Sequence, residues 1–314
     1  MPTVSVVITT YHRPDFLMEA IASVQAQTYT DWELIVVSDG CTDDTEWRVR
    51  AVARRDLRVR LITQPNRGMA EGRNTGIRAA RGELIAFLDD DDVWLPEKLA
   101  RQVERFRRRP QLGVCFSRYH DLELETGQQT LKPAQPVRNL QELYHAGNIL
   151  PSAALVRRRC FEAVGLFNPA RLRFDDKEMW LRIARRFPIE CVDAPLTVRR
   201  IGSYSYERQP SYQIGYFQQL RQVYEDFQLE SGDGISAWQR RAQIAKYTFF
   251  LGWAYQQAGQ WPQAAREYAR ALRTNPLVGF DARHELGLAW WQAIIRSWTL
   301  WARALGQRQT PCPQ

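Results

Sequence analysis

Four consecutive carboxylates, Asp89 to Asp92, directly follow a run of apolar residues. Like charges crowded in this way repel one another unless a cation compensates them. In an extended segment Asp89 and Asp91 share one side and can face a ligand, whereas Asp90 points away. All-oxygen ligation suits Mn²⁺ or Mg²⁺, and diphosphate oxygens would complete the shell of such an ion. The alternative is an acidic turn that caps a helix beginning near Pro96.

The elements that position these residues alternate between strand and helix patterns. We expect strands at residues 4–10, 34–37, 59–62 and 84–88, and helices from about Pro14, after residues 43–45 and near residues 70–79. This alternation predicts a mostly parallel sheet flanked by helices. The unusual polar residues fall just after strands, at the carboxyl edge where open α/β sheets bind ligands.

The middle third is less regular and the last third is helical. We expect strands at 114–116, 154–156 and 196–198, which enclose a helix at 177–186. We expect these strands to join the same sheet as the strands of the first part. From Ser211 the pattern is wholly helical, and residues 231–234 are the best candidate linker.

Composition narrows the class of protein. The 314 residues, 45% hydrophobic and 25% charged, fit a globular chain with two lobes. The five cysteines are scattered, which argues against a disulfide framework or zinc site and indicates reduced thiols. Neither a secretory signal nor a run of eighteen apolar residues occurs. Dinucleotide-binding and P-loop glycine motifs do not occur either.

Several segments in order carry a family resemblance. They are residues 5–13, 27–29, 33–40, 66–68, 70–76, 85–92 and 93–99. The chain resembles family 2 glycosyltransferases, densely over residues 3–100 and more thinly to about 206. The resemblance implies a GT-A-type α/β fold with a nucleotide-sugar-binding half at 1–110 and an acceptor-binding half at 111–206. An all-helical extension would occupy 207–314.

The resemblance also implies a nucleotide site. Its residues would be Thr10, Tyr11, Arg13, Asp39, Arg73, Asp89 and Asp90, with Asp91 and Asp89 as metal ligands. Tyr11 offers an aromatic face for a pyrimidine, Asp39 can accept the ring N–H of uracil, and Arg73 can bind the base edge or diphosphate. The alternatives are a half-buried loop aromatic for Tyr11 and a turn-forming residue for Asp39.

A second acidic pair, Asp175 and Asp176, is similar to the family's acceptor-side motif. In that pattern Asp176 is the base that takes the acceptor's proton during inverting, in-line displacement. The alternative is that both residues cap the helix that follows. Asp175 could also cap this helix while Asp176 catalyses. Trp180 and Arg182 complete the motif, with Arg182 expected in a structural ion pair. After the last strand, where relatives often carry a histidine, Arg200 could reach the diphosphate.

The C-terminal extension contains two distinct patterns. Residues 245–276 have the spacing of one tetratricopeptide-like helical hairpin, although a plain helical pair is the alternative. Residues 286–306 form a Trp-rich, Arg-bearing amphipathic stripe that suits an anionic membrane surface or packing on other helices. From Arg240 onward ten Lys and Arg residues stand against three acids, a surplus of seven. Basic residues are not interleaved with a nucleic-acid-binding module, so nucleic acid is not expected as a partner.

These observations predict an inverting, metal-dependent glycosyltransferase. Its donor would be a nucleoside diphosphate sugar, with UDP favoured, and its acceptor a saccharide or lipid-linked saccharide in surface polysaccharide assembly. It would act in the cytoplasm, peripherally at the inner face of the membrane. A nucleotidyltransferase would want a glycine-rich loop after the first strand, and residues 10–15 contain no glycine. The remaining alternative is a catalytically degenerate adaptor that acts through its C-terminal helices.

Overall fold

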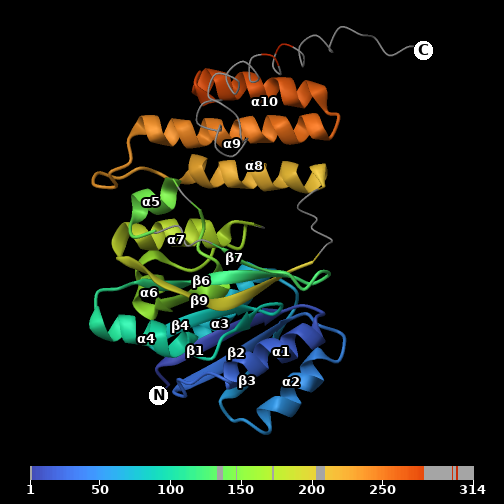
Figure 1. The fold of residues 1–314 in the computed structure, drawn as a ribbon, viewed down its shortest axis with the longest axis vertical. Coiled ribbons are helices and arrows are strands. Elements are labelled where there is room, and N and C mark those ends of the chain that lie inside the picture. The colour runs from blue at the N-terminus through green and yellow to red at the C-terminus, as the bar shows by residue number, and fades with distance from the viewer. Residues whose placement is uncertain are drawn as a thin grey trace, which may run out of the picture. The chain divides into compact units, whose positions relative to one another are not determined.

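The computed structural model describes residues 2–132, 137–145, 147–171, 173–202, 209–278, 299 and 302. The chain divides into two units, Met1–Ser203 and Tyr204–Gln314 (Figure 1). The predicted linker at residues 231–234 lies between two helices of the second unit.

The first half of the first unit alternates strands with helices. Its elements are β1 (Val4–Thr10), α1 (Pro14–Gln25), β2 (Trp32–Asp39), α2 (Thr45–Ala53), β3 (Val59–Gln64), α3 (Met69–Ala79), β4 (Leu84–Asp89), β5 (Val93–Trp94) and α4 (Lys98–Arg108). The second half contains β6 (Val114–Glu123), β7 (Gln129–Lys132), α5 (Leu140–His145), the 3-10 turn η1 (Pro151–Ala153), β8 (Ala154–Arg157), α6 (Arg158–Val164), α7 (Asp175–Arg186) and β9 (Ile189–Ile201).

The strands described form one sheet in the order β3-β2-β1-β4-β8-β6-β9-β5, with β7 paired to β6. Strands β1 to β4 are mutually parallel, whereas β8 is antiparallel to both β4 and β6. Strand β9 runs parallel to β6, and β5 is antiparallel to β9. The predicted α/β architecture is confirmed, and the sheet is mixed: β1 to β4 form a parallel block, and β6 and β9 form a second parallel pair.

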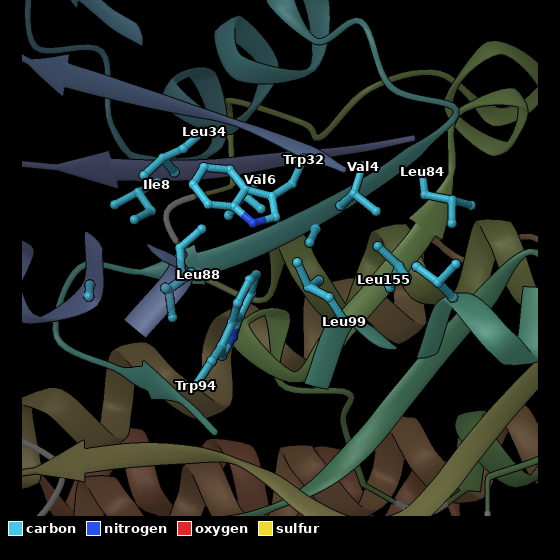
Figure 2. Packing of buried hydrophobic residues seen from close by; sticks show 14 of the residues in the cluster. Val4, Val6, Ile8, Trp32, Leu34, Leu84, Leu88, Trp94, Leu99 and Leu155 are labelled. Carbon is cyan, nitrogen blue, oxygen red and sulfur yellow. The ribbon is translucent and has the colours of Figure 1, made fainter. Parts of the chain in front are cut away.

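Alternate residues of β1 face two helix layers. Val4, Val6 and Ile8 join a buried cluster with residues of α1 and α4, and Figure 2 shows them in the same cluster as Leu88 and Trp94. On the opposite face α3 lies close to the sheet, because a Cβ at Gly72 would stand 2.3 Å from Cγ2 of Thr9. Glycine at this position therefore brings the backbone of α3 against β1.

The register of the parallel strands places their carboxyl ends at one edge. Thr9 of β1 is paired with Asp89 of β4, and Thr10 is paired with Ser38 of β2. The predicted polar residues that follow β1, β2 and β4 consequently share this edge.

The second unit contains three helices in its described residues, α8 (Pro210–Asp226), α9 (Ala237–Gln257) and α10 (Trp261–Thr274). Ser236 and Gln239 form a capping box at the start of α9. Gly252 lets α10 approach, since a Cβ there would lie 2.9 Å from the ring of Tyr268. The helical pair is present, and its tetratricopeptide-like character stays a prediction.

The amphipathic helix predicted over residues 286–306 falls outside the described residues, apart from positions 299 and 302. Within the part of the chain that the structure describes, no helix combines the length and apolar character needed to cross a membrane.

Candidate active site

The acidic run forms a tight turn at the end of β4. The backbone N–H of Asp92 donates to the carbonyl of Asp89 at 3.1 Å, and Asp90 and Asp91 occupy the turn between them. The expected extended segment is therefore wrong, because the chain turns at Asp90 and Asp91. The helix-capping alternative is also wrong: α4 begins at Lys98, and its N-cap has no side-chain cap.

Two residues at and just beyond the end of β1 bind the acidic turn. Thr10 Oγ1 donates to Asp90 Oδ2 at 2.7 Å. Arg13 Nη1 donates to Asp91 Oδ2 at 2.6 Å and lies 3.5 Å from an Asp90 oxygen. The half-exposed Arg13 thus provides positive charge at the open side of the turn, where a diphosphate could also contact it.

The turn is more negative than Arg13 can compensate. Burial raises the pKa of Asp90 to about 6, and the neighbouring carboxylates of Asp91 and Asp89 add to that rise. Burial and Asp89 also raise the pKa of Asp91 and that of Asp92. Crowded hard oxygens with raised pKa values are a donor set that suits a divalent cation. Within the described ranges, however, no three His, Cys, Asp or Glu side chains are grouped to hold an ion.

Arg73 connects the two acidic groups. It is buried on α3, where Nη2 donates to Asp89 Oδ1 at 2.9 Å and Nη1 donates to Asp175 Oδ2 at 3.0 Å. Burial alone lowers the pKa of Arg73, but Asp89, Asp175 and Asp176 raise it above its ordinary value. Its role toward a base or diphosphate stays a prediction, since both Nη atoms already bind carboxylates of the protein.

The second acidic pair opens α7. The N-cap is Phe174 in a left-handed conformation with φ of 59°, and it makes no side-chain cap. Asp175 is the first helical residue and binds Arg73, so the expectation that Asp175 caps the helix is wrong. A non-glycine residue with positive φ beside these carboxylates marks a backbone held in place by its surroundings.

Asp176 is held at both carboxylate oxygens. Asn148 Nδ2 donates to Oδ2 at 2.5 Å, and the backbone N–H of Lys177 donates to Oδ1 at 2.7 Å. Burial and the charge of Asp175 raise the pKa of Asp176 to about 6, whereas Arg73 opposes the rise. A carboxylate with this pKa is mostly ionised at neutral pH and is a stronger base than an exposed aspartate.

Trp180 and Arg182 hold the framework around α7. Trp180 is fully buried, and its Nε1 donates to the carbonyl of Ile149 at 2.8 Å. Arg182 pairs with Glu178 at 2.8 Å and also donates to carbonyls of the loop before α7. The ion pair expected for Arg182 is present.

Arg200 lies near the acidic turn through its backbone. Its N–H donates to Asp92 Oδ1 at 3.2 Å, whereas its guanidinium pairs with Glu19 of α1 and lies over the Phe16 ring. A contact from Arg200 to diphosphate would require the side chain to leave Glu19.

The predicted nucleobase residues differ in accessibility. Tyr11 is 51% exposed and presents its ring at the edge of the sheet. Asp39 is buried and accepts hydrogen bonds from Gln64 Nε2 and from the backbone N–H groups of Arg67 and Gly68, at 2.7 to 2.9 Å. Asp39 thus orders the loop before α3, and contact with a nucleobase stays a prediction for both residues.

Sequence reasoning missed two residues of the site, Asn148 and Ser152. Asn148 binds Asp176, and Ser152 Oγ accepts from the backbone N–H of Asp89 at 3.0 Å. Neither stands in a recognisable motif, because each reaches a partner at least 28 positions away in the sequence.

Comparison with known proteins identifies the family. A family model described as glycosyl transferase family 2 matches residues 5–165. An uncharacterized glycosyltransferase of Rickettsia conorii is 28% identical over 223 residues, which cover 68% of this chain and 35% of that protein. The chain therefore spans about a third of that relative.

A shorter match carries a more specific name. The Escherichia coli protein called UDP-Glc:alpha-D-GlcNAc-diphosphoundecaprenol beta-1,3-glucosyltransferase WfgD is 39% identical over 101 residues, covering 32% of this chain and 39% of that one.

Two solved structures share the fold over nearly the whole chain. S. aureus TarS 1–349 in complex with UDP-GlcNAc has a TM-score of 0.66 at 15% identity, covering 99% of this chain and 93% of that one. The mannosyltransferase PcManGT from Pyrobaculum calidifontis in complex with GDP-Man and Mn²⁺ has a TM-score of 0.61 at 20% identity, covering 98% and 87%.

Proposed function

This chain belongs to glycosyl transferase family 2, and we propose that it transfers a sugar with inversion from a UDP-sugar to a saccharide or lipid-linked saccharide. The observation that carries the proposal is the double ion pair of Arg73. Its guanidinium binds Asp89 of the acidic turn and Asp175 of the second acidic pair, at 2.9 and 3.0 Å. The carboxylates that we assign to the donor side and to the acceptor side are thus joined by one guanidinium.

Asp176 acts as the general base in this proposal. One carboxylate oxygen accepts the proton of the acceptor hydroxyl as that hydroxyl attacks the anomeric carbon, and the bond to the nucleoside diphosphate breaks on the opposite side. Asn148 and the backbone of Lys177 orient the carboxylate while leaving lone pairs for the acceptor.

Asp91 and Asp89 would hold a divalent cation, Mn²⁺ or Mg²⁺. The fit rests on the crowded carboxylates of the turn, where Asp89 helps to raise the pKa of Asp91, and PcManGT carries Mn²⁺ beside GDP-Man. Such an ion, when bound, neutralises charge that develops on the leaving diphosphate. Arg13 adds positive charge from the protein, because its half-exposed guanidinium lies at the same turn.

The choice of UDP rests on the relatives and on side chains at the ends of β1 and β2. WfgD is named for UDP-Glc, and TarS was solved with UDP-GlcNAc. Tyr11 provides an exposed ring on which a uracil could stack, and Thr10 and Asp39 end the adjacent strands β1 and β2. Asp90 would act beside Thr10, to which it is hydrogen bonded.

The acceptor and setting are proposed by analogy. WfgD is named for a lipid-linked acceptor, GlcNAc-diphosphoundecaprenol. If the acceptor is lipid-linked, transfer takes place at the membrane surface. The chain would then lie peripherally at the inner face of a membrane, where the basic C-terminal extension could contact anionic lipid.

Calorimetric titration tests the donor site directly. UDP, GDP and dTDP are titrated into the protein with and without Mn²⁺, and into Asp91→Ala. We expect UDP to bind most tightly and only when Mn²⁺ is present, and we expect this binding to disappear in Asp91→Ala. Asp193→Ala is the matched control, because Asp193 is an exposed aspartate paired with Arg118. Absence of binding by all three nucleotides would refute the proposal.

A further inference from the structure

The segment 147–152 contacts both acidic groups of the site. Near its start, Asn148 Nδ2 donates to Asp176 Oδ2 at 2.5 Å. At its end, Ser152 Oγ accepts from the backbone N–H of Asp89 at 3.0 Å. The acidic pair of α7 and the acidic turn after β4 are thus joined by one short stretch of backbone.

Two side chains of α7 anchor the first part of this segment. Lys177 Nζ donates to the carbonyl of Gly147 at 2.5 Å, and Trp180 Nε1 donates to the carbonyl of Ile149 at 2.8 Å. Both bonds end on backbone oxygens, so they fix the path of the chain on either side of Asn148. The side chain of Asn148 consequently meets Asp176 in one defined place.

The last residue of the segment is anchored as firmly. The carbonyl of Ser152 accepts from Trp94 Nε1 at 2.7 Å and from Thr197 Oγ1 at 3.2 Å, and Ser152 is fully buried. Strands β5 and β9 thereby hold Ser152 beside the first residue of the acidic turn.

We propose that Asn148 is a positioning residue for Asp176 and that the segment 147–152 sets the spacing between Asp176 and the acidic turn. The catalytic meaning of this inference rests on the proposed function, in which Asp176 is the base. Asn148 fixes one oxygen of Asp176 while the Lys177 N–H fixes the other. The carboxylate can then meet an acceptor hydroxyl without first reorienting.

The groups around Asp176 show how Asn148 affects its ionisation. Asp175 disfavours its ionised form, and Arg73 of α3 favours it. The ammonium of Lys177 is directed to the carbonyls of Leu143 and Gly147. The amide of Asn148 donates to the carboxylate and favours ionisation, so its removal must shift titration of Asp176 upward.

Titration by NMR provides the primary test. Carboxyl ¹³C shifts of aspartate-labelled protein are followed against pH, and Asp176 is assigned by its loss in Asp176→Asn. We expect Asn148→Ala to raise the titration midpoint of Asp176 by about one to two pH units. Asn148→Asp, which keeps the size of the side chain but removes the donor, should raise it at least as far.

The matched control is Asn139→Ala, which removes an amide that accepts from the N–H of Glu142 at the start of α5. Its titration midpoint for Asp176 should equal that of the parent protein. Thermal unfolding of each variant tests whether the fold persists. If Asn148→Ala does not fold, the midpoint measured in Asn148→Asp decides the question. An unmoved midpoint in the folded Asn148 variants would overturn the positioning role.

Catalysis separates this inference from the proposed function. The assay measures the rate at which UDP is released from UDP-glucose or UDP-GlcNAc with water as acceptor. In Asn148→Ala this rate should fall about 10- to 100-fold at neutral pH, and the affinity for UDP should not change. Ser152→Ala should instead weaken Mn²⁺-dependent UDP binding and leave the Asp176 midpoint unchanged. If Asp176→Asn releases UDP at the parent rate, the proposed base is wrong. If Asp176→Asn is inactive but Asn148→Ala keeps the parent rate and midpoint, the positioning role alone is wrong.

Discussion

Arg73 on α3 and Asp175 on α7 are 102 positions apart in the sequence and lie in direct contact, with 3.0 Å between Nη1 and Oδ2. The same guanidinium binds Asp89, so three elements of the first unit meet at one buried cation. Such a cation compensates charges that the interior would otherwise disfavour. It therefore contributes to stability as well as to the arrangement of the site.

Replacing Arg73 by Met should destabilise the first unit strongly. Asp89 and Asp175 would keep their places without a counterion, and breaking a buried pair in this way costs about 3–5 kcal/mol. Urea unfolding measures the loss. Arg78→Met is the control on the same helix, since Arg78 forms an exposed pair with Glu71 worth at most about 1 kcal/mol. Equal stability of the two variants would contradict the role given to Arg73.

Asp176→Asn should remove the base while preserving the donor site. Amide nitrogen cannot accept the acceptor's proton, so turnover should fall by about 100- to 10,000-fold. Calorimetry should show UDP affinity within about twofold of the parent protein, because Asp176 acts on the acceptor hydroxyl and not on the nucleotide in this mechanism. Glu178→Gln is the matched carboxylate control on α7 and should retain turnover. A fully active asparagine variant would exclude Asp176 as the base.

The rate of transfer should increase with pH through about 6. Asp176 must be ionised to accept a proton, and burial together with Asp175 raises its pKa to about 6. Below that pH the fraction of ionised base, and with it the rate, falls about tenfold per pH unit. The measurement is the initial rate from about pH 5 to 8 at saturating Mn²⁺, because protonation of Asp90 over the same range would remove a negative charge beside the proposed metal ligands and weaken metal binding. A flat profile would contradict the assignment.

The parallel half of the sheet could be predicted closely from local pattern. The strand expected at residues 4–10 has those bounds, since a continuous β-branched run suits a strand buried on both faces. Strand β9 is much longer than the three residues expected, extending over Ile189–Ile201. It pairs with β6 through two register shifts, and such pairing depends on tertiary contacts rather than on a local period.

The site residues could be predicted where they directly follow a predicted strand. Aspartates that end strands can be found by their position, so Asp89 and Asp39 were expected at the carboxyl edge. The contacts of Asn148 and Ser152 arise from the path of segment 147–152 across two elements, which no short motif encodes. The turn at Asp90 and Asp91 was predicted only as the alternative and only as a helix cap, because alternation of faces holds only while the chain stays extended.

Gly72→Ala should displace α3 from the sheet. Its Cβ would lie 2.3 Å from Cγ2 of Thr9, so helix or strand must move, at a cost of about 1–3 kcal/mol in unfolding free energy. The neighbouring Arg73 would shift with the helix, and UDP binding should weaken as well. Gly202→Ala is the control, since a Cβ there meets no atom of the described residues within 4 Å. Thr9→Ser should restore part of the stability by removing the opposing methyl group, and failure to do so would place the strain elsewhere.

Lys98→Met should stabilise the protein most at low pH. Lys98 is fully buried at the start of α4, where Nζ donates to Gln102 Oε1 at 2.8 Å and lies 4.0 Å from the centre of the Trp94 ring. Burial lowers its pKa to about 7 in the folded chain, against about 10.4 when exposed. Between these values the unfolded chain binds a proton that the folded chain does not, so the free energy of unfolding of the parent protein rises with pH across this window.

The advantage of the Lys98→Met variant is therefore greatest below about pH 7 and shrinks as the pH approaches 10. Urea unfolding of both proteins at pH values on either side of this window measures the difference. Arg101→Met, which removes an exposed cation from the same helix, should show no such pH dependence relative to the parent. A stability difference for Lys98→Met that stays constant from neutral to alkaline pH would show that Lys98 keeps its charge in the folded protein, with the Trp94 ring and Gln102 stabilising the ammonium.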